Sequence, residues 1–181
     1  MRRKTLDLLL NWVGVVLTVM LLVAGVGLFI GYSFTNSQVR SQLVEQKIYF
    51  PTKGGLDYQD LVRAHLTSYA GEEVLTGTEA QIFANDIIGV DTSAISGGKT
   101  YSQISAASLK DPSNTSLANE VNIVFRGDTL RGLLLDVYAF GFLGVVALYA
   151  AIASFVLALI MLVLTLLGVR HYRQGDPADV I

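Results

Sequence analysis

Two long stretches without a charged residue constrain this chain more than any other feature of its sequence. They run from Leu8 to Val39 and from Val137 to Val169. Because a membrane-spanning helix needs about 20 consecutive apolar residues, each stretch is long enough to cross a bilayer. Soluble domains contain about 25% charged residues, whereas this chain of 181 residues contains 15%. We therefore expect a mainly α-helical membrane protein with two transmembrane helices.

Basic residues flank the two stretches and predict their orientation. Residues 2–4 are Arg-Arg-Lys, and Arg170, His171 and Arg173 follow the second stretch. Because segments rich in Lys and Arg stay in the cytoplasm, we expect both termini on the cytoplasmic side of the plasma membrane. A cleaved signal peptide is the alternative for the first stretch. Its apolar run exceeds the 7–15 residues of a signal-peptide core, which favours a retained anchor.

The predicted organisation divides the chain into five parts. These are a cytoplasmic N-terminus at 1–9, a transmembrane helix at 10–32, an extracytoplasmic domain at 33–132, a juxtamembrane segment with the second transmembrane helix at 133–169, and a cytoplasmic C-terminus at 170–181. The middle part is long enough for one small domain, which we expect to be mostly helical.

Apolar spacing and capping residues predict the helices of this domain. Apolar residues three and four positions apart predict a helix over Tyr58–Tyr69, with His65 on its apolar stripe. Thr76 and Glu79 have the spacing of a capping box. We expect the helix that they start to end at Gly89.

The remaining segments of the domain are predicted from turn and strand residues. Residues 48–51 predict a short strand. Pro51 limits this strand to the edge of a sheet, because proline has no N–H to donate to a neighbouring strand. Residues 91–100 are rich in Ser and Gly and predict a loop. A further helix is expected to begin near Asn114 and to continue into the second stretch. The first helix is expected to continue over 40–47, with three apolar side chains turned inward: Val39, Leu43 and Val44.

The sequence argues against several kinds of chemistry. The absence of cysteine excludes disulfides and thiolate ligands, and the formal net charge of −2 argues against nucleic-acid binding. Gly98-Lys99-Thr100 resembles the end of a phosphate-binding loop, but Ser93 stands where that loop needs glycine. Ser96 and Lys99 have the spacing of a penicillin-binding motif, but two intervening glycines disfavour the required helix. We expect no catalytic residue, cofactor or metal ion, and hence no enzyme.

Two small-residue patterns predict helix packing inside the membrane. Gly27 and Gly31 have the spacing that lets two helices approach closely in lipid. A second set shares one face of the second stretch and consists of Ala147, Ala151, Ser154 and Ala158. These faces pack either the two spans of one chain together or one subunit against another, and the sequence leaves both alternatives open.

Charged residues concentrate where the chain re-enters the predicted membrane. They are Arg126, Asp128, Arg131 and Asp136. If this segment is helical, Asp128 and Arg131 can pair across one turn. The cluster predicts either an anchor among lipid headgroups or a docking surface for a partner's outer domain.

Six short motifs are distributed over nearly the whole chain. They are Arg2–Lys4, Gly31–Phe34, Gln46–Pro51, Val74–Gly77, Tyr101–Ser105 and Thr129–Leu135. With these motifs, the chain resembles a family of actinobacterial two-span membrane proteins of unknown function. Relatives are sometimes labelled aromatic ring-opening dioxygenases, a chemistry that needs two histidines on one iron ion. Because His65 and His171 are expected on opposite sides of the membrane, the resemblance implies the architecture and no activity.

Together these features predict a non-enzymatic accessory subunit of a cell-envelope complex. We expect it to contact the lipid bilayer and either a membrane-protein partner or further copies of itself. The alternative is an extracytoplasmic module that binds a lipid or a glycan through aromatic side chains: Tyr49, Phe50, Tyr58, Tyr69, Phe83 and Tyr101.

Overall fold

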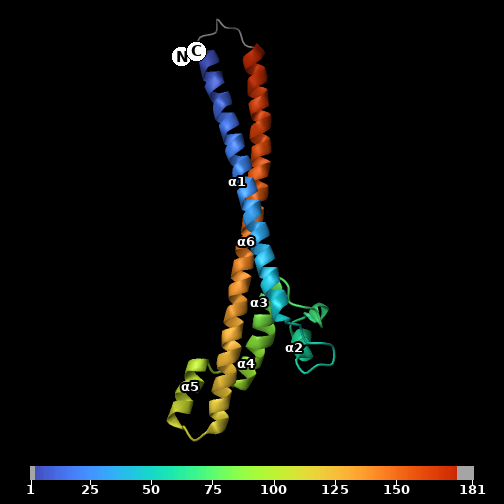
Figure 1. The fold of residues 1–181 in the computed structure, drawn as a ribbon, viewed down its shortest axis with the longest axis vertical. Helices are drawn as coiled ribbons and strands as arrows, with labels where there is room; N and C mark the ends of the chain where they lie inside the picture. The colour runs from blue at the N-terminus through green and yellow to red at the C-terminus, as the bar shows by residue number, and fades with distance from the viewer. Residues whose placement is uncertain (1–2, 175–181) are drawn as a thin grey trace. The chain divides into compact units, whose positions relative to one another are not determined.

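The computed structural model describes the backbone of residues 3–174 and the side chains of residues 5–173. Residues 1–2 and 175–181 of the two predicted cytoplasmic ends lie outside the described residues. Six α-helices, one 3-10 helix and one π-helix make up the described part, and no strand occurs in it (Figure 1). The predicted mainly helical fold is therefore confirmed.

Two helices are long and apolar enough to cross a membrane. Helix α1 covers Arg3–Gln46 with 44 residues, and α6 covers Thr115–Gln174 with 60 residues. At a rise of 1.5 Å per residue, they are about 66 and 90 Å long. Both therefore continue well beyond the roughly 30 Å of a hydrocarbon core.

The ends of α1 and α6 lie where the sequence predicts them. Lys47, with a φ of 49°, follows the end of α1. The side-chain oxygen of Asn114 accepts a hydrogen bond from the Leu117 N–H at 3.0 Å and so caps the start of α6. Val39 and Leu43 are buried as expected, but Val44 is exposed and the prediction for it was wrong.

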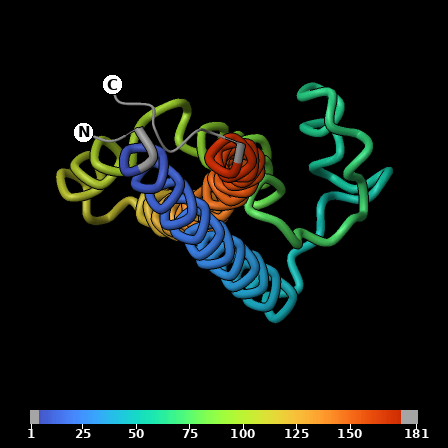
Figure 2. Tube along the Cα trace, turned by 90° about the horizontal axis from the view of Figure 1, so that it is seen from above, coloured from blue at the N-terminus to red at the C-terminus, as the bar shows by residue number. Residues whose placement is uncertain are grey.

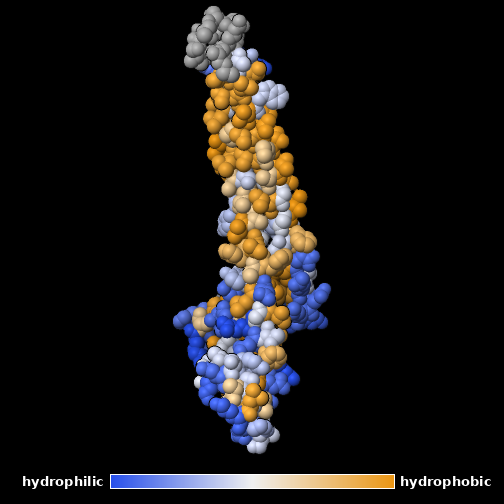
Figure 3. All heavy atoms as spheres, turned by 90° about the vertical axis from the view of Figure 1, so that its left-hand side faces the viewer, coloured by the Kyte–Doolittle hydropathy of each residue, from blue (hydrophilic) through white to orange (hydrophobic). Residues whose placement is uncertain are grey.

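The chain forms two compact units, which we call the terminal unit (residues 1–34 and 144–181) and the middle unit (residues 35–143). In the terminal unit, α1 and α6 lie side by side through small residues. A Cβ atom on Gly14 would clash with Thr165, and one on Gly25 would lie 2.8 Å from the Phe155 ring. Hydrophobic residues cover most of the visible surface of this unit (Figure 3).

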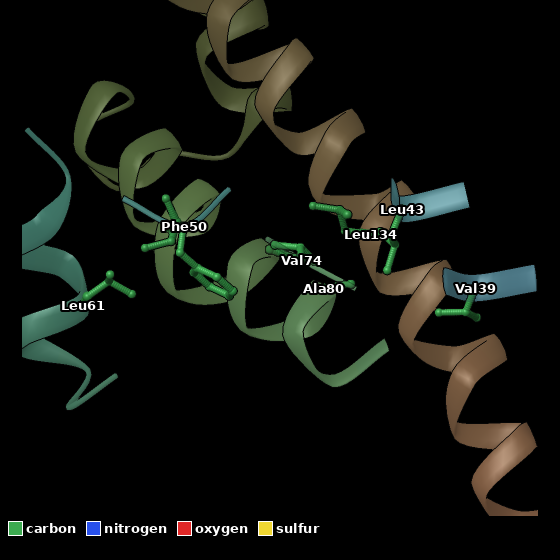
Figure 4. Packing of buried hydrophobic residues seen from close by; sticks show 9 residues of the cluster. Val39, Leu43, Phe50, Leu61, Val74, Ala80 and Leu134 are labelled. Carbon is green, nitrogen blue, oxygen red and sulfur yellow. The ribbon is translucent and has the colours of Figure 1, made fainter. Parts of the chain in front are cut away.

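The core of the middle unit gathers side chains from five helices and from the segments before α2 and before α3 (Figure 4). Its buried members are Val39, Leu43, Phe50, Leu61, Val74, Ala80, Ala84, Ile87 and Leu134. Phe50 lies at the centre of an aromatic group, because its ring centroid is 5.2 Å from that of Tyr69 and 5.5 Å from that of Phe83. The segment that carries α2 (Tyr58–Arg63) lies to one side of the other helices of this unit (Figure 2).

The helix predicted over Tyr58–Tyr69 is interrupted, so that prediction was wrong. Helix α2 ends at Arg63, and a short 3-10 helix, η1, covers Thr67–Tyr69. His65 has a φ of 58°, while the Leu66 N–H bonds the Leu61 carbonyl and the His65 N–H bonds the Val62 carbonyl. This pair of hydrogen bonds with a left-handed residue is a Schellman motif, which ends a helix. His65 is consequently exposed rather than placed on a buried stripe.

A continuous helical segment covers residues 77–95. It consists of α3 (Gly77–Ile82), the π-helix η2 (Phe83–Ile88) and α4 (Gly89–Ile95). The capping box of Thr76 and Glu79 is confirmed. Gly89 does not end this helix, because its φ of −64° continues the helical backbone.

Two further predictions for the middle unit were wrong, and one of its helices was not predicted. The first half of the loop predicted over 91–100 belongs to α4, and the chain then turns through Gly97 and Gly98, which have φ values of 60° and 77°. Helix α5 (Tyr101–Lys110) was not predicted, although Thr100 and Gln103 form a second capping box. The strand expected over 48–51 is only an isolated bridge between Tyr49 and Glu73.

Candidate functional site

Segment 77–95 packs against α6 at backbone contact. A Cβ atom on Gly77 would lie 3.3 Å from the Tyr138 Cα and 3.4 Å from the Gly141 Cα. At the other end, a Cβ atom on Gly127 would clash with Thr92. Residue 77 therefore faces 141 and residue 92 faces 127, so the two helices run antiparallel.

Arg131 joins α6 to the π-helix in the middle of this contact. Its Nη2 and Nε atoms donate hydrogen bonds to the Asn85 Oδ1 at 2.9 and 3.3 Å. A Cβ atom on Gly89 would lie 3.4 Å from the Arg131 Nε, so glycine leaves room for the guanidinium. Asn85 belongs to the π-helix η2, and its side chain reaches α6 through these two hydrogen bonds.

The four residues of the predicted juxtamembrane cluster therefore have different surroundings in the structure. Arg131 is half-buried and bonds Asn85, whereas Arg126, Asp128 and Asp136 are exposed. Among the described side chains, Asp128 and Arg131 form no ion pair, so the pairing predicted across one turn does not occur. Docking to a partner by these four residues stays a prediction.

The two predicted small-residue faces also differ in burial: the face on α6 is largely covered, whereas the face on α1 is exposed. In the terminal unit, Ala151 and Ala158 are buried, while Ala147 and Ser154 are half-buried. Gly27 and Gly31 are exposed, and a Cβ atom on either would meet no heavy atom within 4 Å, its own helix backbone aside. Sequence reasoning missed Gly14 and Gly25, which make the contact between α1 and α6.

The aromatic residues proposed for ligand binding do not form one surface. Phe50, Tyr69 and Phe83 contact one another in the core of the middle unit. Tyr101 instead packs on Phe125, with ring centroids 5.5 Å apart. The structure therefore does not bring these side chains together as a single binding face.

An open groove of about 770 Å³ lies in the middle unit. Val39 and Gln42 of α1 form one wall, Ile88 of η2 contributes to a second, and Leu130 and Val137 of α6 form a third. Its volume and mostly apolar lining are typical of sites for small apolar ligands. This groove was not predicted, because its walls come from segments nearly 100 residues apart.

A smaller polar cavity of about 210 Å³ lies beside Ser96, Lys99, Asp128 and Arg131. The Ser96 hydroxyl donates to the Ser93 carbonyl of its own helix at 3.4 Å. Lys99 follows the two glycines that end α4 and is exposed. Ser96 and Lys99 therefore do not share a helical face, and the geometry offers no activated serine.

Three carboxylates meet between α2 and α4. The oxygens of Asp57, Asp60 and Asp91 all lie within 4.8 Å of one another. Such oxygens could serve as ligands for Ca²⁺, but Asp60, only 6% exposed, already accepts a hydrogen bond from Arg63. Burial raises the pKa of Asp91, the negative charges of Asp57 and Asp60 raise it further, and Arg63 opposes them. The cluster therefore places three carboxyl groups beside a single arginine, Arg63.

We expect mild acidification to stabilise the middle unit. A raised native pKa means that the native state binds more protons than the unfolded state, so stability increases as the pH falls from neutral toward about 4. Asp91→Asn should raise the unfolding temperature at pH 7 and flatten its pH dependence, with Glu72→Gln as an exposed control. Thermal unfolding of the full chain in detergent between pH 7 and 4.5 measures both effects. An unchanged unfolding temperature for Asp91→Asn would contradict this prediction.

The fold defines the class of this protein. It is a mostly helical chain with two helices that are long and apolar enough to cross a membrane. Comparison of the sequence and structure with models of protein families, with curated proteins and with solved structures finds no match. The resemblance to the actinobacterial two-span family stays a prediction.

Proposed function

We propose that this chain is a non-enzymatic subunit of a membrane complex, anchored by α1 and α6. The observation that carries this proposal is the open face of α1 at Gly27. Two helices in lipid associate through close backbone packing, since lipid tails remove the hydrophobic driving force between helices. A glycine exposed on an apolar helix is therefore suited to contact a helix of another subunit.

Helix α1 has two separate small-residue faces, which supports this assignment. The face with Gly14 and Gly25 already contacts α6 in the terminal unit. Gly27 lies two residues beyond Gly25 and is therefore about 160° away around the helix. A side chain at Gly27 has open space above it. The contact between the two spans of one chain thus does not explain this second glycine.

The proposal places residues 33–132 outside the cytoplasm. The arginines and lysine at 2–4 and the basic residues from Arg170 onward support this orientation through the positive-inside rule. The visible face of the middle unit carries many hydrophilic side chains, which suits an aqueous location (Figure 3).

Cysteine labelling tests the orientation directly, because the chain contains no cysteine of its own. Leu56 and Leu109 are 98% and 80% exposed in the middle unit. We expect a membrane-impermeant maleimide to label Leu56→Cys and Leu109→Cys in intact cells. His171→Cys should be labelled only after the cells are permeabilised. The reverse pattern would place the middle unit in the cytoplasm and overturn this part of the proposal.

Leucine at Gly27 should weaken assembly. The side chain fills the space that a neighbouring helix would use, and overpacking of this kind costs about 1–3 kcal/mol, or roughly tenfold in association. Size-exclusion chromatography in mild detergent measures the change for Gly27→Leu. Leu22→Ala is the control, because Leu22 is exposed about 140° around α1 from Gly27.

Cross-linking followed by affinity purification of the full chain from its own membranes identifies the other subunit. One stoichiometric protein, or a homo-oligomer that Gly27→Leu disrupts, supports the proposal. A monomer without stoichiometric partners, unchanged by Gly27→Leu, would contradict it.

A further inference from the structure

We propose that the groove of the middle unit binds one acyl chain of a membrane phospholipid. The groove is lined by apolar side chains of α6, of which Leu130, Leu133 and Phe140 are exposed. Exposed apolar side chains that converge on one concave surface mark a binding site more often than scattered ones do. A hydrocarbon chain covers such walls without requiring hydrogen bonds.

The position of the groove along both helices indicates where its ligand comes from. Val39 is the last residue of the uncharged stretch of α1, and Val137 is the first residue of that of α6. Both residues line the groove. From Val137 the wall continues along α6 to Leu130, a distance of about 10 Å. The groove therefore lies around the ends of the two uncharged stretches and extends away from them along α6.

Three polar side chains also line the groove: Gln42, Gln46 and Asp136. Gln42 and Gln46 follow Val39 by three and seven residues, so they share its face of α1 and line the groove beyond it. Their amides can bond the ester oxygens of a lipid. Asp136 is exposed in the same groove, and its carboxylate favours a headgroup that carries a cationic ammonium over an anionic one. These features together favour a zwitterionic phospholipid.

Fluorescence quenching by brominated lipid tests this site. The proposal of a lipid site depends on the membrane insertion proposed above. Trp12 is the single tryptophan, so Trp12→Phe provides a silent background. Leu130→Trp places a reporter in the groove, and Thr129→Trp places one on the neighbouring exposed face of α6 at the same height. The full chain is reconstituted in phosphatidylcholine vesicles, either plain or brominated at carbons 9 and 10 of the acyl chain.

We expect bromination to remove about half of the fluorescence at Leu130→Trp and little at Thr129→Trp, because mid-chain carbons of free lipids stay within the hydrocarbon core. Equal quenching at both positions, or none at Leu130→Trp, would overturn the proposal. Because a new tryptophan can alter the groove, Gln42→Trp with Ser41→Trp as its control repeats the test from α1. The same difference is expected for this pair.

A separate measurement distinguishes failure of this site from failure of membrane insertion. Flotation of the vesicles after an alkaline wash shows whether the chain is inserted. An inserted chain whose groove tryptophans are not selectively quenched contradicts the lipid site alone. A chain that does not float contradicts the proposed membrane anchoring as well.

Discussion

Replacing Phe50 by alanine will lower the free energy of unfolding of the middle unit by about 3–5 kcal/mol. Phe50 is 1% exposed, and its ring contacts those of Tyr69 and Phe83. It therefore joins the segment around η1 to the π-helix. Removing the ring leaves a cavity and separates these two parts of the core.

Pulse proteolysis of the full chain in detergent measures this loss, because cleavage in the middle unit reports its unfolded fraction. Tyr49→Ala is the matched control, since the neighbouring Tyr49 is 53% exposed. It should change the free energy of unfolding by less than about 1 kcal/mol. Equal effects of the two substitutions would show that Phe50 does not hold the core together.

Leucine at Gly141 will destabilise the middle unit by about 2–3 kcal/mol. A Cβ atom at Gly141 would lie 3.3 Å from the Gly77 Cα, which is a backbone atom and cannot rotate away. The side chain therefore forces α6 away from segment 77–95. This separation also strains the hydrogen bonds between Arg131 and Asn85.

Gly132→Leu is the control on the same helix and should have the opposite sign. A Cβ atom at Gly132 would meet no heavy atom within 4 Å, its own helix backbone aside. Leucine there should stabilise the helix by up to about 1 kcal/mol, because glycine is a poor helix former. Hydrogen exchange of residues 77–95 measures both substitutions. Unchanged protection in Gly141→Leu would contradict the proposed packing of the two helices.

The two apolar helices, the capping box at Thr76 and the start of α6 near Asn114 were predictable from sequence. Each depends on residues that are neighbours along the chain: an uncharged run, a Thr and a Glu three positions apart, or an Asn before a helical pattern. The capping box at Thr100 has the same kind of signal. Helix α5 could therefore have been predicted, although the Ser and Gly residues before it indicated a loop.

The groove and the acidic cluster could not be predicted in this way. Asp57 and Asp91 are 34 positions apart, and Val39 and Val137 are 98 positions apart. No spacing rule links such residues, because their proximity depends on how α2 packs on α4 and how α1 packs on α6. The end of α2 at Arg63 was missed for a related reason. The apolar spacing through Tyr69 gave no sign that His65 would adopt a left-handed backbone.

By itself, the sequence determined that the chain forms long apolar helices and where several of them begin, since these properties depend on local composition and capping. Only the tertiary structure decided which face of each helix is used. Both Gly25 and Gly27 suit close packing, yet Gly25 contacts α6 and Gly27 does not. The physical reason is that small residues permit an approach from any direction, whereas the packing of all the helices together selects one.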